Sequence, residues 1–412
     1  MPSKKKTKIF TSEVLKVYQK VNPSIHFILN KRDFEYREKV KLNIFENLLN
    51  FPKKMFKNEK ILEFGSGTGD TSIYYSRWGA KLTGVEVNRE AIKRCKQIYK
   101  KYHKKRDFKF INQSLFDYKK KKLFDLVTAD GVLHHTDDPK KGLKILCDSL
   151  KPNGYLIYGT NLSSGRFLRN LQRYILFKYS FKKFNKVDHH EIERLARKFF
   201  KSHLDRAEKF GNRSKKAIIY DDYINPKIKS FSLQDTLKMF QQNSLTVYSS
   251  WPPILLNSTG QSHNLADTKK NYLKNRNLID KLDLNWSLTT FEDETINKLI
   301  DKNYKKFKKN LYNMKTIFEE FSNIDPYNFK RINQKKLGNV KQNFRLFRNQ
   351  AIKDPQSENS LNLLKEINKL YKLLSVNASE EKMSNFLSNA RYLFKGYCGI
   401  GINYFICRKN KK

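Results

Sequence analysis

Ile61-Leu62-Glu63-Phe64-Gly65-Ser66-Gly67-Thr68-Gly69-Asp70 is an apolar run that leads into three glycines at alternate positions. Glycine accepts a positive φ angle and lets a ligand approach the backbone where a Cβ would stand in the way. Glu86 ends the next expected strand, seventeen residues after Gly69, where a carboxylate can accept both hydroxyls of a ribose. The loop reads G-x-G-x-G after an acid, so it differs from the dinucleotide pattern G-x-G-x-x-G. The stretch therefore predicts a ribose-containing ligand at a glycine turn between a strand and a helix.

Short apolar runs alternate with helical patterns between Lys60 and Thr160, which is typical of βαβ units around a parallel sheet. The expected strands are Lys60–Phe64, Lys81–Glu86, Asp107–Asn112, Phe124–Asp130 and Tyr155–Thr160. Helices are expected between them, at about residues 70–78, 88–103 and 138–150. Asp138 caps the last of these helices and Pro139 lies in its first turn. The fold class is therefore predicted to be α/β.

The segments on either side of this core are predicted to be mainly helical. Before it, Asp33–Leu49 has apolar residues at helical spacing, namely Tyr36, Val40, Ile44 and Leu48. After it, residues 233–243 predict a helix and Leu245–Ser250 a sixth strand. A heptad seam then runs from Ile300 to Phe321, for which packing within the chain is favoured over a coiled-coil dimer. Further helical stripes follow at about residues 363–374 and 379–394.

The composition is strongly basic, with 84 Lys and Arg against 40 Asp and Glu and a formal net charge of +44. Hydrophobic residues make up 39% and aromatic residues 13%, which argues against a mainly disordered chain. The charge fits either nucleic-acid binding or the Lys-rich composition that an AT-rich genome imposes, and a solvated surface is the favoured interpretation.

Cysteine usage and hydropathy indicate the compartment. Cys95, Cys147, Cys398 and Cys407 lie far apart with no CxxC pair, which disfavours a disulfide scaffold and a structural zinc site. The basic start is not followed by the apolar stretch of a signal peptide, and no window approaches the length of a membrane span. A cytoplasmic location is therefore expected.

The basic excess is concentrated after the fifth strand, where residues 166–216 hold sixteen Lys and Arg against five Asp and Glu. Arg166, Arg169 and Arg173 fall on one helical stripe. Apolar residues occupy the opposite face: Phe167, Leu168, Leu171, Tyr174 and Ile175. A surface helix packed on the sheet is favoured; the alternative is a face that grips an anionic substrate, a phosphate backbone or an acidic lipid headgroup.

Residues 60–162 resemble the class I S-adenosylmethionine-dependent methyltransferases, most closely the methyltransferase domain of ubiquinone and menaquinone biosynthesis enzymes. The first motif of that family is an acid followed by G-x-G-x-G, and an acid at the end of its second strand binds the cofactor ribose. Phe124-Asp125-Leu126-Val127, Gly131-Val132-Leu133-His134-His135-Thr136 and Leu150-Lys151-Pro152-Asn153-Gly154-Tyr155-Leu156 look like its fourth-strand and fifth-strand signatures. The resemblance implies a Rossmann-like seven-stranded sheet and S-adenosyl-L-methionine as cofactor.

The resemblance also implies which residues bind this cofactor. They are Glu63, Gly65, Ser66, Gly67, Gly69, Glu86, Ser114, Leu115, Asp130 and Gly131. Glu63 would hold the methionine amino end through the loop, Glu86 the ribose, and Asp130 with Gly131 would border the methionine part. Ser114 stands where the family usually has an acid near the adenine, and a serine can still hydrogen-bond the base.

Methyl transfer from a sulfonium requires alignment of the acceptor with the methyl group, and it does not require a nucleophilic side chain. No metal site is expected. If the acceptor is a hydroxyl or a protonated nitrogen, His134 or His135 could remove its proton. Either histidine could instead only orient the loop or pack under the helix. Asn161, just beyond the fifth strand, is a candidate to hydrogen-bond the substrate. Asp221, Asp222 and Tyr223 are weaker candidates and are more typical of a turn.

The C-terminal segment has the composition of a buried strand, because Gly401–Cys407 contains Ile402, Tyr404, Phe405 and Ile406. Methyltransferases of this class usually complete the sheet with an antiparallel seventh strand, and residues 398–408 are predicted to supply it. The expected division is a helical flank (1–59), a core (60–257) with a basic insertion (163–230), a helical insertion (258–395) and a returning strand (396–412). The helical insertion would cover the acceptor side of the cleft.

The favoured function is S-adenosylmethionine-dependent methyl transfer to a small-molecule or lipid-like acceptor through O, N or C. The first alternative is an RNA methyltransferase that uses the basic insertion, although no base-methylation signature follows the fourth strand, where Ala129-Asp130-Gly131-Val132 stands. The second is a non-catalytic subunit of the same fold that docks a partner through its helices. Peripheral membrane contact and the oligomeric state are left open.

Overall fold

The computed structural model describes residues 14–21, 30–103, 107–211, 213–254, 279, 280, 282, 283, 286, 358–394 and 402–411. The chain forms two compact units. The sheet unit consists of Met1–Asn161, Asp235–Leu255 and Ile402–Lys412, and the helical unit of Leu162–Gln234 and Leu256–Gly401. The four-part division expected from the sequence stays a prediction. The heptad seam and Cys398 lie outside the described residues.

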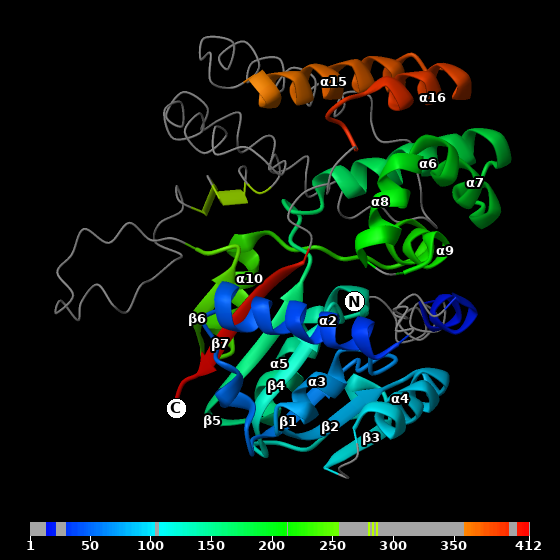
Figure 1. Cartoon of the computed structure of the whole chain (residues 1–412). Helices are drawn as coiled ribbons and strands as arrows, with labels where there is room; N and C mark the ends of the chain where they lie inside the picture. The colour runs from blue at the N-terminus through cyan, green and yellow to red at the C-terminus, as the bar shows by residue number, and fades with distance from the viewer. Residues whose placement is uncertain are drawn as a thin grey trace. The chain divides into compact units, whose positions relative to one another are not determined.

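The sheet unit is built on seven strands. They are β1 (Lys60–Phe64), β2 (Lys81–Glu86), β3 (Phe108–Asn112), β4 (Phe124–Asp130), β5 (Leu150–Thr160), β6 (Leu245–Trp251) and β7 (Asn403–Lys409). Their order across the sheet is β3-β2-β1-β4-β5-β7-β6, and the first five are joined in parallel. β7, red in Figure 1, runs antiparallel between β5 and β6. The predicted α/β, Rossmann-like sheet with a C-terminal seventh strand is confirmed.

The position of β7 inside the sheet buries its apolar side chains, which stabilises the sheet unit. Phe405, Ile406 and Cys407 are at most 1% exposed, and the Phe405 ring lies 5.3 Å from that of Phe240. Each side of β7 forms a hydrogen-bonded ladder, with β5 on one side and β6 on the other. A basic tail left in solvent would give up this burial and leave two sheet edges open.

Helices connect the strands as the sequence predicts. They are α3 (Ser72–Arg77), α4 (Arg89–Tyr102), α5 (Pro139–Ser149) and α10 (Leu233–Gln242). α5 begins at Asp138, whose side chain accepts a hydrogen bond from the Lys141 N–H at 2.9 Å, and Pro139 occupies the first turn. Asn88 caps α4 in the same way through the Glu90 N–H.

An N-terminal helical flank is present, but its buried face is not the stripe marked by Tyr36, Val40, Ile44 and Leu48. α2 (Lys31–Asn43) continues into a π-helical turn, Ile44–Leu48. Tyr36 is 67% exposed and Val40 43% exposed, whereas Phe34, Lys41 and Phe45 are buried. Hydropathy favoured the wrong face because the buried face contains a lysine, whose ammonium is paired with Asp130 of β4.

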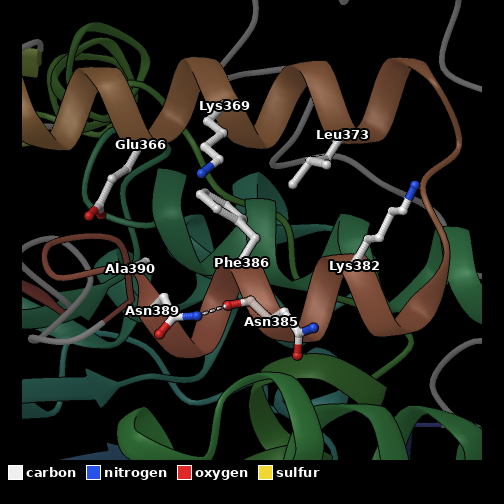
Figure 2. Close-up of a pocket in the computed structure, with 8 residues that line it drawn as sticks. All are labelled: Glu366, Lys369, Leu373, Lys382, Asn385, Phe386, Asn389 and Ala390. Carbon is white, nitrogen blue, oxygen red and sulfur yellow. Dashed lines mark hydrogen bonds between the residues drawn. The ribbon is translucent and has the colours of Figure 1, made fainter.

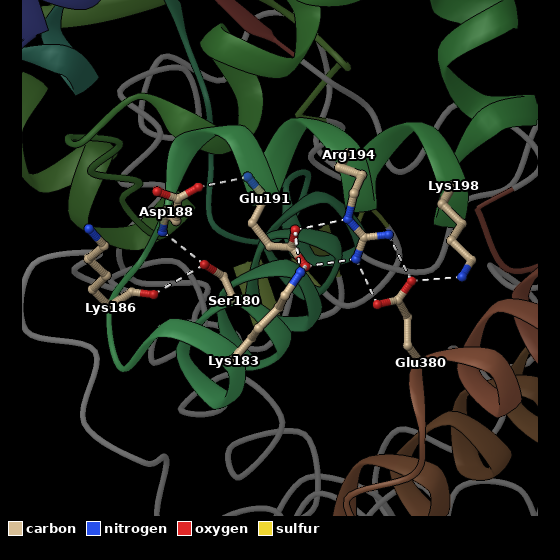
Figure 3. Close-up of polar contacts among 8 residues, drawn as sticks. All are labelled: Ser180, Lys183, Lys186, Asp188, Glu191, Arg194, Lys198 and Glu380. Atoms are coloured by element: carbon tan, nitrogen blue, oxygen red, sulfur yellow. Dashed lines mark hydrogen bonds and ion pairs between the residues drawn. The ribbon is translucent and has the colours of Figure 1, made fainter.

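The helical unit contains α6 (Phe167–Phe184), α7 (His189–Phe199), α8 (Lys201–Gly211), α9 (Lys215–Ile219), a π-helical turn (Tyr220–Ile224), α15 (Glu358–Ser375) and α16 (Glu380–Asn389). α15 and α16 confirm the helical insertion expected before the last strand. The first turn of α16 is fastened to α7, because Glu380 accepts hydrogen bonds from Arg194 and Lys198, each at 2.7 Å (Figure 3). The hydrogen bond from Arg194 lowers the pKa of Glu380 to about 2.

The arginine stripe of α6 is internal, which corrects both interpretations of a solvent-facing basic surface. Arg166 and Arg169 pair with Asp222, which is itself partly buried. Arg173 is 1% exposed and donates to the backbone carbonyls of Tyr223, at 3.1 Å, and Asn225, at 2.6 Å. These guanidinium groups satisfy a carboxylate and two carbonyls inside the unit, and so the helix is buried on its basic face as well as on its apolar face.

No helix in the described parts of the chain is long and apolar enough to span a bilayer. The cytoplasmic location stays a prediction.

Candidate functional site

The glycine loop leaves the carboxyl end of β1 with three residues at positive φ: Gly65 at +66°, Gly67 at +52° and Gly69 at +78°. The loop is tied to β2 because the Gly65 N–H donates to the Val85 carbonyl at 2.8 Å. A Cβ on Gly65 would lie 2.4 Å from Val132, and one on Gly69 would lie 2.8 Å from Cys95 Sγ. Both the conformation and the close approach therefore require glycine at these positions.

Glu86 closes the loop from the end of β2, as the sequence predicts. Its Oε2 accepts the Gly67 N–H at 2.9 Å, and its Oε1 accepts the Asn88 N–H at 2.8 Å. Burial raises the pKa of Glu86, while these backbone N–H groups act in the opposite direction. Each carboxylate oxygen has a second lone pair, so the side chain can shape the loop and still accept ligand hydroxyls.

Glu63 lies in β1 directly before the loop and is 3% exposed. Its Oε2 has no hydrogen-bond partner among the described residues. Burial raises the pKa of Glu63 to about 7. A hydrogen bond with Ser72 and the positive charge of Lys41 act in the opposite direction and lower this pKa, but they do not outweigh burial. A buried acid with an unsatisfied oxygen favours a cationic ligand group, because such a group would both pair with it and stabilise its ionised form.

Ser114 and Leu115 follow β3 and form a short 3₁₀ turn, Leu115–Asp117. The Ser114 Oγ accepts the Phe116 N–H at 3.2 Å and so caps this turn. The hydroxyl hydrogen can still be donated to a neighbouring acceptor. Ser66, in the loop itself, is buried.

Asp130 ends β4 and has two partners that sequence reasoning missed. Its Oδ2 accepts from Lys41 Nζ of α2 at 3.0 Å and from the Tyr404 hydroxyl of β7 at 3.1 Å. Gly131 follows at φ +73° and its N–H donates to the Gly159 carbonyl at 3.0 Å. A single sequence does not show that a lysine and a tyrosine more than three hundred residues apart contact the same carboxylate. The sequence predicted only that β7 returns to the sheet, which places Tyr404 in the strand next to β5.

His134 and His135 lie in a 3₁₀ turn, Leu133–His135, just after Gly131, and their ring centroids are 4.0 Å apart. His134 is 2% exposed, and its Nε2 lies 2.9 Å from Nδ2 of Asn161. With the amide in this orientation, the His134 Nε2 lone pair is occupied. His135 is only half-buried and therefore more accessible than His134.

The sheet unit thus brings together Glu63, the glycine loop, Glu86, Asp130, Gly131, the two histidines and Asn161 at the carboxyl ends of its parallel strands. In open α/β sheets this edge is where ligands bind. The weaker candidates Asp221, Asp222 and Tyr223 belong to the helical unit. There Asp222 pairs with Arg166 and Arg169, and the Tyr223 hydroxyl donates to Gln172 at 3.1 Å.

A groove of about 460 Å³ lies between α15 and α16 and contains none of the predicted site residues (Figure 2). It is lined by Glu366, Lys369, Leu373, Lys382, Asn385, Phe386, Asn389 and Ala390. The Glu366 carboxylate accepts the backbone N–H groups of Arg391, Tyr392 and Leu393 at 2.7–3.0 Å, so it secures the chain after α16.

Residues 36–199 match the family model described as a methyltransferase domain. The mitochondrial ubiquinone biosynthesis O-methyltransferase of Schizosaccharomyces pombe is 32% identical over 114 residues, which cover 26% of this chain and 40% of that protein. The ubiquinone biosynthesis O-methyltransferase of Pelagibacter ubique is 30% identical over 122 residues, which cover 29% and 50%. The chain therefore spans half or less of the length of these relatives. The solved structure of PKMT2 from Rickettsia typhi with AdoHcy aligns with a TM-score of 0.41 and 18% identity, covering 60% of this chain and 49% of that one.

Proposed function

The chain carries a class I S-adenosylmethionine-dependent methyltransferase domain, and from this premise we propose that it transfers a methyl group from S-adenosylmethionine to a small-molecule or lipid-like acceptor. The observation that carries the proposal is the glycine loop closed by Glu86 beside the buried, unsatisfied carboxyl of Glu63. The names of the matched relatives specify O-methylation in ubiquinone biosynthesis. A hydroxyl on a lipid-like quinone precursor is therefore the first acceptor to test.

The residues present fit the cofactor on chemical grounds. Glu63 would pair with its amino group, because an ammonium would satisfy Oε2 and favour the ionised carboxylate. Glu86 would accept the ribose hydroxyls with its remaining lone pairs, and the glycine backbone of the loop would line the ligand. Ser114 and Leu115 would border the adenine, and Asp130 and Gly131 the methionine part. When bound, the sulfonium cofactor supplies an electrophilic methyl carbon.

His135 is the proposed general base for a hydroxyl acceptor, and His134 with Asn161 is the proposed support that orients it. His135 is the more accessible ring, and His134 is buried with its Nε2 engaged. A base is useful only if the acceptor must lose a proton as the new bond forms. The remaining task of the chain is to hold acceptor and methyl carbon in line and to exclude water.

An RNA acceptor is less well supported than a small molecule, because Arg166, Arg169 and Arg173 are committed to contacts inside the helical unit. The arginine stripe of α6, which suggested a phosphate-binding surface, therefore makes contacts within the helical unit instead. The salt dependence of turnover separates the two acceptors, since binding dominated by phosphates weakens steeply with rising salt.

The experiment is transfer of the labelled methyl of S-adenosylmethionine by the full chain into lipid, small-metabolite and RNA fractions of source cells. The proposal expects label in the lipid or metabolite fraction, with turnover that changes little with salt. Label confined to RNA and lost at high salt would favour the RNA alternative. Binding of the cofactor without label in any fraction would favour the non-catalytic alternative.

A further inference from the structure

We infer that Lys41, Asp130 and Tyr404 form a positioning cluster in which helix α2 and strand β7 of the sheet unit together hold the turn that borders the cofactor cleft. The inference rests on the proposed function. Lys41 and Tyr404 touch neither acceptor nor cofactor in it; they act through the Asp130 carboxylate.

Both donors converge on the same oxygen. Asp130 Oδ2 accepts from the Lys41 ammonium at 3.0 Å and from the Tyr404 hydroxyl at 3.1 Å. The Lys41 side chain is 7% exposed and that of Asp130 is 17% exposed, so the ion pair is shielded from solvent. Lys41 Nζ also lies over the rings of Phe45, Tyr75 and Tyr404, at 5.5–5.8 Å from their centroids.

The sheet is built to let Asp130 reach Tyr404. In the strand ladders Asp130 pairs with Gly159 of β5, and Gly159 pairs with Tyr404 of β7. Gly159 thus separates the two residues, and a Cβ on it would lie 2.4 Å from Asp130 Oδ1. The missing side chain at Gly159 leaves the space that the Asp130 carboxylate occupies.

Fixing Asp130 fixes the turn that follows it. Gly131 adopts φ +73° and donates its N–H to Gly159, and the next residues form the 3₁₀ turn that carries His134 and His135. Asn161, at the end of β5, contacts His134 at 2.9 Å. A shift of Asp130 would therefore move the backbone on which both histidines lie.

The cluster also acts electrostatically on Glu63. The Lys41 ammonium lowers the pKa of Glu63, whereas the Asp130 carboxylate raises it. The other titratable groups that interact with Glu63 are Glu86 of β2, Tyr75 of α3, and Cys95 and Tyr99 of α4. Changing the charge of Lys41 or Asp130 therefore shifts the pH at which Glu63 ionises, in opposite directions.

The test is calorimetric titration of the full chain with S-adenosylhomocysteine from about pH 5.5 to about pH 8, a range that brackets the pKa of Glu63. Three variants are compared with wild type: Tyr404→Phe, Lys41→Met and Asp130→Asn. Tyr248→Phe on β6 and Lys39→Met on α2 are matched controls, because both side chains are exposed and outside the cluster.

Tyr404→Phe is expected to weaken binding by about 2- to 30-fold, the range of coupling through intervening residues. Lys41→Met is expected to move the pH midpoint of binding upward, and Asp130→Asn to move it downward. The double variant should return toward the wild-type midpoint. A role limited to fold stability would lower thermal stability without opposite movements of the midpoint.

The inference is overturned if Tyr404→Phe binds as tightly as wild type, or if Lys41→Met and Asp130→Asn leave the midpoint in place. If Lys41→Met fails to fold, Tyr404→Phe and Asp130→Asn still decide the question. Failure of wild type to bind S-adenosylhomocysteine at any pH would instead reject the proposed function, and the inference with it.

Discussion

Glu63 of β1 and Glu86 of β2 are two buried acids that flank the glycine loop and have different hydrogen-bond environments. Both Glu86 oxygens accept backbone N–H groups, whereas Glu63 Oε2 has no partner among the described residues. A buried carboxyl without full hydrogen bonding favours its neutral form, and the pKa of Glu63 is accordingly raised to about 7. The ionised Glu63 carboxylate therefore destabilises the ligand-free protein, and a cationic ligand that pairs with it would remove this destabilisation.

The first prediction follows from the sign of that shift. An acid whose pKa rises on folding from 4.5 to about 7 destabilises the folded state as pH rises through this interval. The full loss would be about 3 kcal/mol, because each unit of pKa shift corresponds to about 1.4 kcal/mol. Glu63→Gln should therefore gain stability over wild type above about pH 7 and show no gain near pH 4.5, as measured by urea unfolding.

Glu90→Gln serves as the control for Glu63→Gln, because Glu90 is an exposed acid at the start of α4. Its difference from wild type should be small at every pH. An equal stability gap between Glu63→Gln and wild type at both ends of the pH range would refute the account of Glu63.

The second prediction concerns the histidine turn. His135→Asn should lower turnover of a hydroxyl acceptor by about 10²–10⁴-fold, the usual contribution of a general base, and leave S-adenosylhomocysteine affinity unchanged. His134→Asn should cost less, because His134 is buried against Asn161 and acts on His135 only by position. Steady-state kinetics would measure both. Unchanged rates in the two variants would contradict a general-base role for these histidines and would favour an acceptor that does not need a base.

At the scale of elements, the local hydropathy pattern predicted well where strands and helices lie along the chain, but it did not predict which charged side chains are buried. β1, β2 and β4 have the residue bounds expected from the sequence, because a strand buried on both faces reads as a continuous apolar run. α2 and α6 were found, but the buried face of α2 and the surroundings of the α6 arginines were missed. Lys41, Arg166 and Arg173 are buried because distant partners compensate them, and a hydropathy pattern does not contain those partners.

The third prediction tests the internal role of the arginine stripe. Arg173→Met should destabilise the helical unit by about 1–3 kcal/mol for each buried carbonyl left unpaired, those of Tyr223 and Asn225. Lys182→Met, at an exposed position of the same helix, is the matched control and should change stability little. Thermal and chemical unfolding would measure the difference. Equal stability of the two variants would contradict the proposal that Arg173 stabilises the helical unit.

At the scale of the whole molecule, the sheet unit is discontinuous in the chain. Its last strand returns after the helical segment and lies between β5 and β6. The composition of Gly401–Cys407 and the incomplete sheet ahead of it made this return predictable. The Asp130 partners and the engagement of His134 by Asn161 were not predictable, because they depend on how strands and helices are placed in three dimensions.

The fourth prediction is that the sheet unit needs its last strand. A chain ending at residue 401 should lose cooperative unfolding and aggregate, because it exposes the facing edges of β5 and β6 and the pocket filled by Phe405 and Ile406. A chain ending at residue 409 keeps all of β7 and is the matched control. Circular dichroism and size-exclusion chromatography would compare them. A stable, monodisperse product ending at residue 401 would contradict the prediction.

The central claim is that the glycine loop and Glu86 bind S-adenosylmethionine, and calorimetric titration of the full chain with S-adenosylhomocysteine tests it most directly. The account predicts one binding event per chain for wild type, and affinity weaker by about 10- to 100-fold for Glu86→Gln. The weakening arises because the amide presents an N–H where the carboxylate accepts, which leaves a buried donor unpaired at about 1–3 kcal/mol. No binding by wild type, or equal affinity in wild type and Glu86→Gln, would contradict it.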